Sequence, residues 1–158
     1  MIRPAEPHKE KVPWPILRPR PDMPLKFISC SRGIFGLDTH YGNKATYPCP
    51  GEMNCERCRR GEPPRYQGYV IGTTGKEGMM AIVHLTANAA LQLLPHITGV
   101  RGLLGARIVL TRDSVAQNSP VGATVFGWDD QIKPVPWERL VEIVHAIYRQ
   151  PVSSKAVK

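Results

Sequence analysis

One histidine and three cysteines lie within nineteen residues of this 158-residue chain. Cys55 and Cys58 form a Cys-x-x-Cys pair, which supplies two thiolates to a single ion from one tight turn. Cys49 lies between two prolines that bend the chain, so we expect this third thiolate to return to the ion without regular secondary structure between the ligands. Because tetrahedral zinc takes thiolate and imidazole ligands, the spacing predicts a zinc site.

The fourth ligand has several candidates. His40 precedes Cys49 by nine residues and has polar neighbours, which favours it. Cys30 ends an apolar run and would act from within a strand, and His84 or water is the remaining alternative. Four protein ligands leave no open position on the metal, so the expected Zn²⁺ is structural and holds a loop rather than activating water.

The cysteines have two other conceivable uses. The start of the sequence is rich in proline and lacks an apolar segment of signal-peptide length, which favours a cytoplasmic protein with reduced thiols over disulfides. A thioredoxin-like redox pair is disfavoured, because the Cys-x-x-Cys motif does not lie between a strand and a helix.

The composition indicates one basic domain. Lys plus Arg number 21 against 13 Asp plus Glu, so the net charge is +8, which favours an anionic polymer or a membrane surface as partner. A hydrophobic content of 42% supports a real core. The longest apolar stretches, Ala87–Leu94 and Leu140–Ile147, are far shorter than a membrane-spanning helix.

The apolar pattern predicts a mainly β (α+β) domain over residues 25–130. Strands are expected at Leu25–Ile28 with a bend at Gly33–Gly36, and then at Tyr66–Ile71, Met79–Leu85, Ala106–Arg112 and Ala123–Trp128. Thr86 is a suitable N-cap for a short helix over Ala87–Leu94. Five short strands and one small helix are typical of a five-stranded OB-like barrel, in which residues 38–62 are an inserted zinc-binding loop.

The two ends of the chain are expected to lie outside this barrel. Residues 1–24 contain seven prolines and five basic residues, which predicts a flexible, polyproline-like arm that is either a solvated tail or a contact to nucleic acid or a neighbouring subunit. Trp14 within it either packs back on the domain or docks into a partner. Residues 131–150 hold a C-terminal helix whose apolar side packs on the barrel or contacts a partner, and residues 151–158 are a disordered tail.

Basic and aromatic residues gather around the metal motif. Single-stranded nucleic acid is bound by a positive groove for the phosphates and by aromatic faces on which bases stack. The candidate nucleic-acid-binding residues are Arg32, Phe35, Tyr41, Lys44, Tyr47, Arg57, Arg59, Arg60, Arg65, Tyr66, Arg107, Arg112 and Trp128. The alternative is that the aromatic residues, Phe35 and Tyr69 above all, belong to the core and the charges are solvated. Trp128 either stacks a base or closes the end of the barrel.

The order His40, Cys49, Cys55 and Cys58 within a small barrel resembles the zinc-containing OB-fold single-stranded-DNA-binding proteins of tailed phages, the helix-destabilising type. The resemblance rests on nineteen residues and on the order of elements. It implies non-sequence-specific binding and protection of single strands in DNA replication or recombination, with zinc ordering one lip of the groove. Such a protein would be nucleoid-associated, or phage-encoded in a host cell.

This chain departs from that family in two respects. Its gaps between ligands are shorter, and its C-terminus is basic, whereas the family recruits partners through an acidic tail. The N-terminal arm is the remaining candidate for self-association along a strand. The sequence does not distinguish DNA from RNA, because stacking and phosphate contacts serve both.

Two other classes of function compete. A zinc-ribbon adaptor would bind protein or duplex nucleic acid through the terminal helix and the arm. An enzyme is disfavoured, because the sequence has no P-loop, no Gly-x-Ser-x-Gly and no paired carboxylates near a histidine. The deaminase pattern also fails, since His40 is not followed by the required Glu and Cys49 lacks the immediate second Cys.

Overall fold

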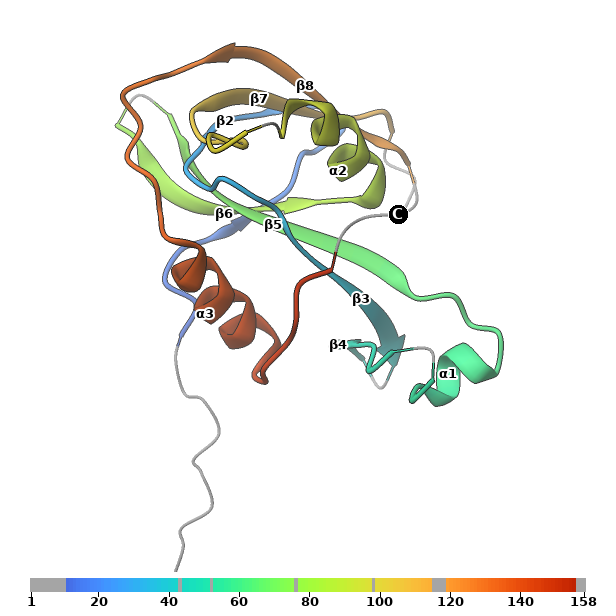
Figure 1. Cartoon of the computed structure of the whole chain (residues 1–158). Helices are drawn as coiled ribbons and strands as arrows, with labels where there is room; N and C mark the ends of the chain where they lie inside the picture. Colours follow the sequence, from blue (N-terminus) through green and yellow to red (C-terminus); the bar gives the residue numbers. More distant parts are fainter. Residues whose placement is uncertain are drawn as a thin grey trace, which may run out of the picture.

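A computed structural model describes residues 11–42, 44–51, 53–75, 77–97, 99–114 and 119–155. Its strands belong to one sheet of eight, in the order β1-β6-β5-β2-β7-β8, with β3 paired to β5 and β4 paired to β3 (Figure 1). The elements are β1 (Ile16–Leu17), β2 (Leu25–Ser29), β3 (Phe35–Gly42), β4 (Ala45–Pro48), α1 (Glu56–Arg59), β5 (Arg65–Thr74), β6 (Met79–Leu85), α2 (Ala87–Leu93), the 3₁₀ turn η1 (Leu94–His96), β7 (Ala106–Arg112), β8 (Val121–Trp128) and α3 (Trp137–Tyr148). The mainly β character is confirmed.

Strand β5 is the long element to which the metal motif is attached. Its residues 65–69 pair with β3, and its residues Gly72 and Thr73 pair with the end of β2. The segment between β2 and β3 stays beside β5, because the N–H of Cys30 donates to the carbonyl of Ile71 at 2.8 Å. The predicted bend near Gly33 is therefore confirmed, and β2 and β3 act as one bent strand along β5.

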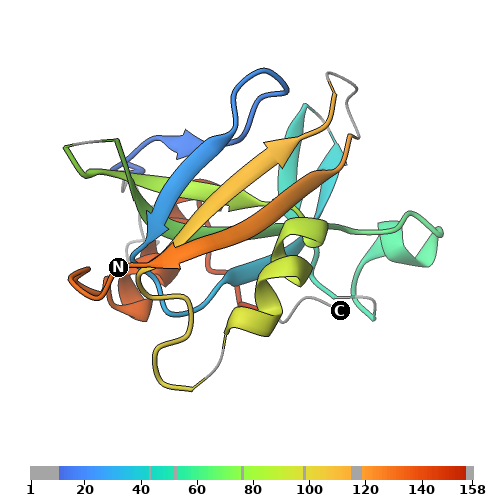
Figure 2. The ribbon, with the colours of Figure 1, turned by 90° about the horizontal axis from the view of Figure 1, so that it is seen from above.

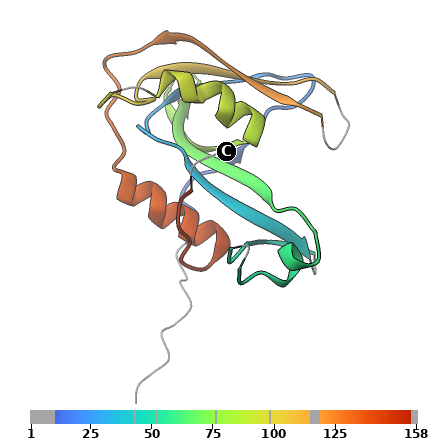
Figure 3. The ribbon, with the colours of Figure 1, turned by 45° about the vertical axis from the view of Figure 1, so that its right-hand side comes forward.

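The sheet has a helix over each face, and its strands β5 and β6 are largely buried on both sides (Figures 1 and 3). On one face, Ala89 and Leu93 of α2 join a core that includes Val70 of β5 and Ile108 of β7. On the other face, α3 contributes Leu140, Ile143 and Val144 to a core with Phe35, Tyr69 and Ile82. Successive side chains of β5 point to opposite faces, so this strand contributes to both cores. The predicted C-terminal helix packs on one of these faces.

The sheet is open, so the prediction of a closed five-stranded barrel is wrong. Within the described residues, β8 pairs with β7 alone (Figure 2). Closure would require β8 to reach β6, but the free edge of β6 is occupied by β1, which pairs with Ile82 and Val83 in parallel. The edge of β8 is covered instead by α2, whose Asn88 amide donates to the carbonyl of Val121 at 3.0 Å.

The described parts of both chain ends lie against the domain. Trp14 packs beside the α3 core, and the guanidinium of Arg139 lies 5.8 Å from the centre of its ring. Residues 1–10 of the expected arm and 156–158 of the expected tail lie outside the described residues. Before them, Lys155 donates its backbone N–H to Gly36 at 2.8 Å and pairs with Asp38 at 2.5 Å. The segments that were expected to be free are therefore attached where the structure describes them.

Nowhere in the described ranges is there a helix with the length and apolar content needed to cross a membrane.

Truncation of Ile143 tests the packing of α3. This side chain is 1% exposed, so Ile143→Ala should lower the free energy of unfolding by about 2 to 5 kcal/mol, because it leaves a cavity between helix and sheet. Glu142→Ala, at the exposed neighbouring position, is the control and should change it by less than about 0.5 kcal/mol. Urea unfolding followed by circular dichroism measures both, and equal values for the two variants would contradict this packing.

Candidate metal centre and basic cavity

The four predicted metal ligands come from three consecutive elements. His40 lies near the end of β3 and pairs with Tyr47 across the β3–β4 hairpin. Cys49 follows β4, and its N–H donates to the carbonyl of Asp38 at 2.8 Å. Cys55 is the N-cap residue of α1, and Cys58 lies within that helix. The described chain between Cys49 and Cys55 contains no helix or strand, as expected, whereas a hairpin joins His40 to Cys49. We call residues 40–62 the metal lobe.

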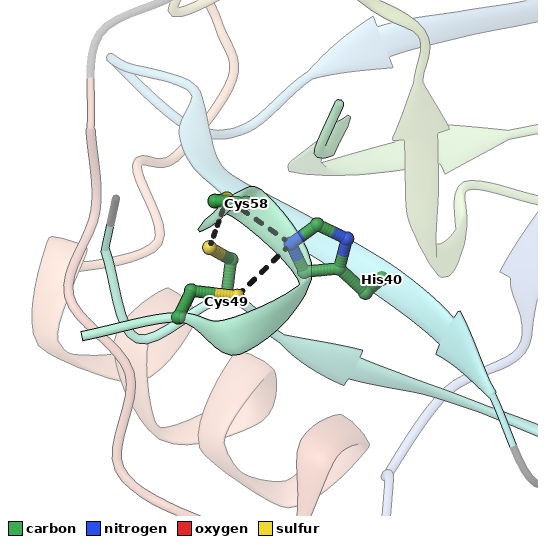
Figure 4. Close-up of side chains that lie close together, drawn as sticks. His40, Cys49 and Cys58 are labelled. Carbon is green, nitrogen blue, oxygen red and sulfur yellow. Dashed lines mark hydrogen bonds between the residues drawn. The ribbon is translucent and has the colours of Figure 1, made fainter. Parts of the chain in front are cut away.

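The ligand atoms converge on one point (Figure 4). One atom from each of His40, Cys49, Cys55 and Cys58 lies within 4.8 Å of all the others. His40 Nε2 is 3.3 Å from the sulfur of Cys55 and 3.4 Å from that of Cys58, and the sulfurs of Cys49 and Cys58 are 3.5 Å apart. A tetrahedral zinc centre has edges of about 3.6 Å between nitrogen and sulfur and about 3.8 Å between sulfurs. The cluster fits a tetrahedral metal ion of this kind.

The surrounding backbone also favours an ionised thiolate at Cys55. The pKa of Cys55 is lowered, first by the backbone N–H of Cys58 and also by that of Arg57, which donate to its sulfur. Burial and the neighbouring thiols of Cys49 and Cys55 raise the pKa of Cys58 to about 12. Three thiolates at such short distances repel one another, so a positive ion between them is what makes the fully ionised set favourable.

The other candidates for the fourth ligand lie elsewhere. Cys30 is buried in the core beneath α3, where burial raises its pKa. His84 lies on β6, and its imidazole makes a short hydrogen bond with the amide oxygen of Gln67. Neither belongs to the cluster of metal-binding side chains. Among the alternatives that the sequence left open, the structure brings His40 to the three cysteines.

Six of the predicted nucleic-acid-binding residues lie on the metal lobe, namely Tyr41, Lys44, Tyr47, Arg57, Arg59 and Arg60. Tyr41 is 68% exposed. Arg57 makes contacts within the lobe itself. Its guanidinium lies against the backbone at Gly42, donates to the carbonyl of Tyr41 at 2.6 Å and lies 5.7 Å from the ring centre of Tyr47. It therefore braces the hairpin against α1, while Tyr41 offers an exposed aromatic surface.

Next to the lobe, a cavity of about 500 Å³ contains three more of the predicted residues, Arg65, Tyr66 and Arg112. Arg18, His84 and Asn88 also line it, and none of the described lining residues is an aspartate or glutamate. We call it the arginine cavity. Its positive charge comes from three guanidinium groups that reach it from residue 18, the start of β5 and the end of β7. Tyr66 supplies an aromatic ring at its wall.

The remaining predicted residues are not in this surface. Phe35 is 1% exposed and stacks on Trp137 at 5.7 Å between ring centres, so its assignment to base stacking is wrong, because α3 covers it. Arg32 donates to the carbonyl of Val100 at 2.9 Å. Arg107 lies at the opposite end of β7 from Arg112, beside Asp129. Trp128, opposite Ala106 at that same end, is 40% exposed under the guanidinium of Arg101.

Three residues that line the cavity, Arg18, His84 and Asn88, are not among the predicted nucleic-acid-binding residues. Arg18 was placed in a flexible arm, and a two-residue strand before it leaves almost no sequence signal. His84 was considered as a ligand alone. Asn88 lies in the first turn of α2 after Thr86, which places it near the end of β6.

Comparison of the chain with protein-family models, with curated proteins and with solved structures found no match.

Metal analysis of two cysteine variants tests the centre. The purified protein should contain about one metal ion per chain, and Cys58→Ala should reduce this to nearly none, because three ligands hold the ion far more weakly. Cys30→Ala is the matched control, since its thiol is buried away from the cluster, and should retain the metal. Elemental mass spectrometry measures both, and equal metal loss in the two variants would contradict the assignment.

Acidification tests the environment of His84. Burial, followed by the charges of Arg18 and Arg65, lowers its pKa from 6.5 to about 3. The unfolded chain takes up this proton below about pH 6.5 whereas the folded chain does not, so the stability due to neutral His84 is complete above that pH and is lost towards pH 3. Between pH 6 and 4 the native protein should lose about 1.4 kcal/mol per pH unit more than His84→Gln. Urea unfolding at several pH values compares them, and parallel curves would refute the assignment.

Proposed function

We propose that this protein binds single-stranded DNA without sequence specificity and protects it during replication or recombination, with a structural Zn²⁺ that orders one side of the binding surface. The function is binding rather than catalysis. We expect it to act in the cytoplasm, on nucleoid-associated or phage DNA, with possible RNA binding through the same contacts and with self-association along the strand through the N-terminal arm.

The observation that carries this proposal is the arginine cavity beside the metal lobe. Arg18, Arg65 and Arg112 line one space from which carboxylates are absent in the described chain. A phosphodiester backbone needs a row of such charges, and an unpaired base needs an aromatic face, each stack contributing about 1 to 3 kcal/mol. Tyr66 in the cavity and Tyr41 on the lobe are half-buried and exposed respectively, so both present ring surface beside the basic groups.

The metal lobe would form one lip of this surface. Thr46 of its β3–β4 hairpin lines the cavity, and Arg59 and Arg60 are exposed on the turn of α1. Arg60 pairs with Glu56 at 2.6 Å, an exposed contact that a phosphate can replace at low cost. Zinc is the metal that we propose, because three thiolates and one imidazole in tetrahedral arrangement are its usual structural ligands.

The order of the strands supports an OB-like arrangement. Strand β2 lies between β5 and β7, its continuation β3 also pairs with β5, β6 follows β5, and α2 connects β6 to β7. In OB-folds the ligand lies across the sheet between the loops that follow the first strand and precede the last one. Here these loops are the metal lobe and the β7–β8 connection, and residues of both line the arginine cavity.

Two arginines of one strand provide the test. Arg112 lines the cavity and Arg107 lies near the other end of β7. Arg112→Gln should weaken the binding of a labelled single strand about tenfold, since a hydrogen-bonded charge contributes about 1.5 to 3 kcal/mol. It should also reduce the slope of log affinity against log salt by about 0.7. Arg107→Gln should change neither, and fluorescence anisotropy over a salt series measures both variants.

Duplex DNA and RNA of equal length complete this experiment. Salt-sensitive binding that is tightest for single-stranded DNA and weakens after removal of the metal supports the proposal. Equal weakening by the two arginine variants would show a diffuse charge effect and remove the cavity from the function. Absence of binding to all nucleic acids would refute the proposal and favour an adaptor that binds protein.

A further inference from the structure

The first strand of the sheet places an arginine at the arginine cavity. Ile16 and Leu17 of β1 pair in parallel with Ile82 and Val83 of β6, and the carbonyl of Pro15 accepts from the N–H of Ile82 at 2.9 Å. In this register the next residue, Arg18, comes beside His84 at the end of β6. The backbone of β1 therefore fixes the base of a side chain that lines the cavity.

The charges of Arg18 and Arg65 converge near one neutral group. His84 is 9% exposed, makes a short hydrogen bond with Gln67 and meets the ring of Tyr69 edge to face at 5.6 Å. Its pKa is about 3, lowered by burial and then by the nearby charges of Arg18 and Arg65. At neutral pH the imidazole is uncharged, so this end of the cavity holds two positive groups around a polar neutral wall.

Two guanidinium groups around one space favour the binding of a phosphate anion. A guanidinium presents a planar fork of N–H donors that matches two oxygens of a phosphate, and two forks around one space bind it better than scattered lysines do. A cavity of about 500 Å³ is also within the size range of sites for small organic ligands. The phosphate of a nucleotide therefore matches the charge and the size of this space.

We infer that the end of the cavity between Arg18 and Arg65 is a phosphate subsite that binds the phosphate group of a nucleotide. The inference extends the proposed function and depends on it for the identity of the nucleotide. Two kinds of ligand carry such a phosphate group. One source is a phosphodiester within a bound strand, and the other is a terminal phosphate at a strand end or on a free nucleotide. Arg18 is the residue that distinguishes this subsite from the rest of the basic surface.

The test compares two arginines of the same segment. Arg18→Gln removes the subsite, while Arg20→Gln removes another exposed charge that does not line the cavity. The probes are inorganic phosphate and thymidine 5′-monophosphate, titrated at constant ionic strength against chloride and followed by calorimetry. Native protein and Arg20→Gln should bind both probes, and Arg18→Gln should bind them at least about tenfold more weakly. Retained circular dichroism and metal content establish that each variant is folded.

Two oligonucleotides of one sequence, with and without a 5′-phosphate, identify the source. If the subsite holds a terminal phosphate, the native protein prefers the phosphorylated strand and Arg18→Gln loses that preference. If it holds an internal phosphodiester, Arg18→Gln weakens both strands equally. Either result supports the subsite.

The subsite and the proposed function fail separately. Phosphate binding that is absent, or equal in Arg18→Gln and Arg20→Gln, overturns the subsite even when single strands still bind. Conversely, phosphate binding that requires Arg18 in a protein with no affinity for single strands retains the subsite and refutes the proposed function.

Discussion

Convergence of four potential metal-binding side chains on one point is the constraint on which the metal lobe depends. The lobe has almost no hydrophobic interior: α1 has no buried residue, and no residue of β4 is fully buried. Its buried side chains in the described chain are the ligands His40 and Cys55. A segment of this size without an apolar core buries too little surface to offset the conformational entropy that it loses on ordering. An ion held by these four side chains would supply the free energy that apolar burial supplies elsewhere in the domain.

The metal lobe is connected to the arginine cavity through two paired strands. β3 carries His40 and pairs with the first half of β5. Next to the ligand, the hydroxyl of Thr39 donates to the carbonyl of Arg65 at 2.9 Å and accepts from Gln67 at 3.4 Å. The position of Arg65 at the arginine cavity is thus tied by hydrogen bonds to the strand that carries His40. Loss of the ion would loosen the lobe and one wall of the cavity together.

The sequence predicted those parts whose determinants are local. The strands Met79–Leu85 and Ala106–Arg112 have the predicted bounds, because dense or alternating apolar residues are a signal within each segment. The four ligands were also found, since the residue types and the Cys-x-x-Cys spacing carry the chemistry directly. Phe35 was misassigned to base stacking because its burial depends on Trp137, which lies about a hundred residues further along the chain.

Long-range pairing explains the other failures. The open sheet depends on β1, whose two residues carry no recognisable strand pattern and acquire a conformation only by pairing with β6. For the same reason Arg18 could not be assigned to a site. The β3–β4 hairpin looked like a loop because its alternation is polar on both sides, and its pairing brings His40 and Cys49 to the cluster.

The open edge of the sheet and the position of the arginine cavity have a common cause. A closed barrel would bring β8 beside β6, and the ends of these two strands would then fill the space between them. Here β1 occupies the edge of β6, while Asn88 and Gln92 of α2 bond to Val121 and Ala123 at the edge of β8. Both edges are thereby protected from pairing with other chains. The cavity lies where closure is prevented, since its lining includes Arg18 after β1, His84 of β6 and Val121 of β8. The short first strand thus keeps the sheet open and brings a positive charge to the opening that it creates.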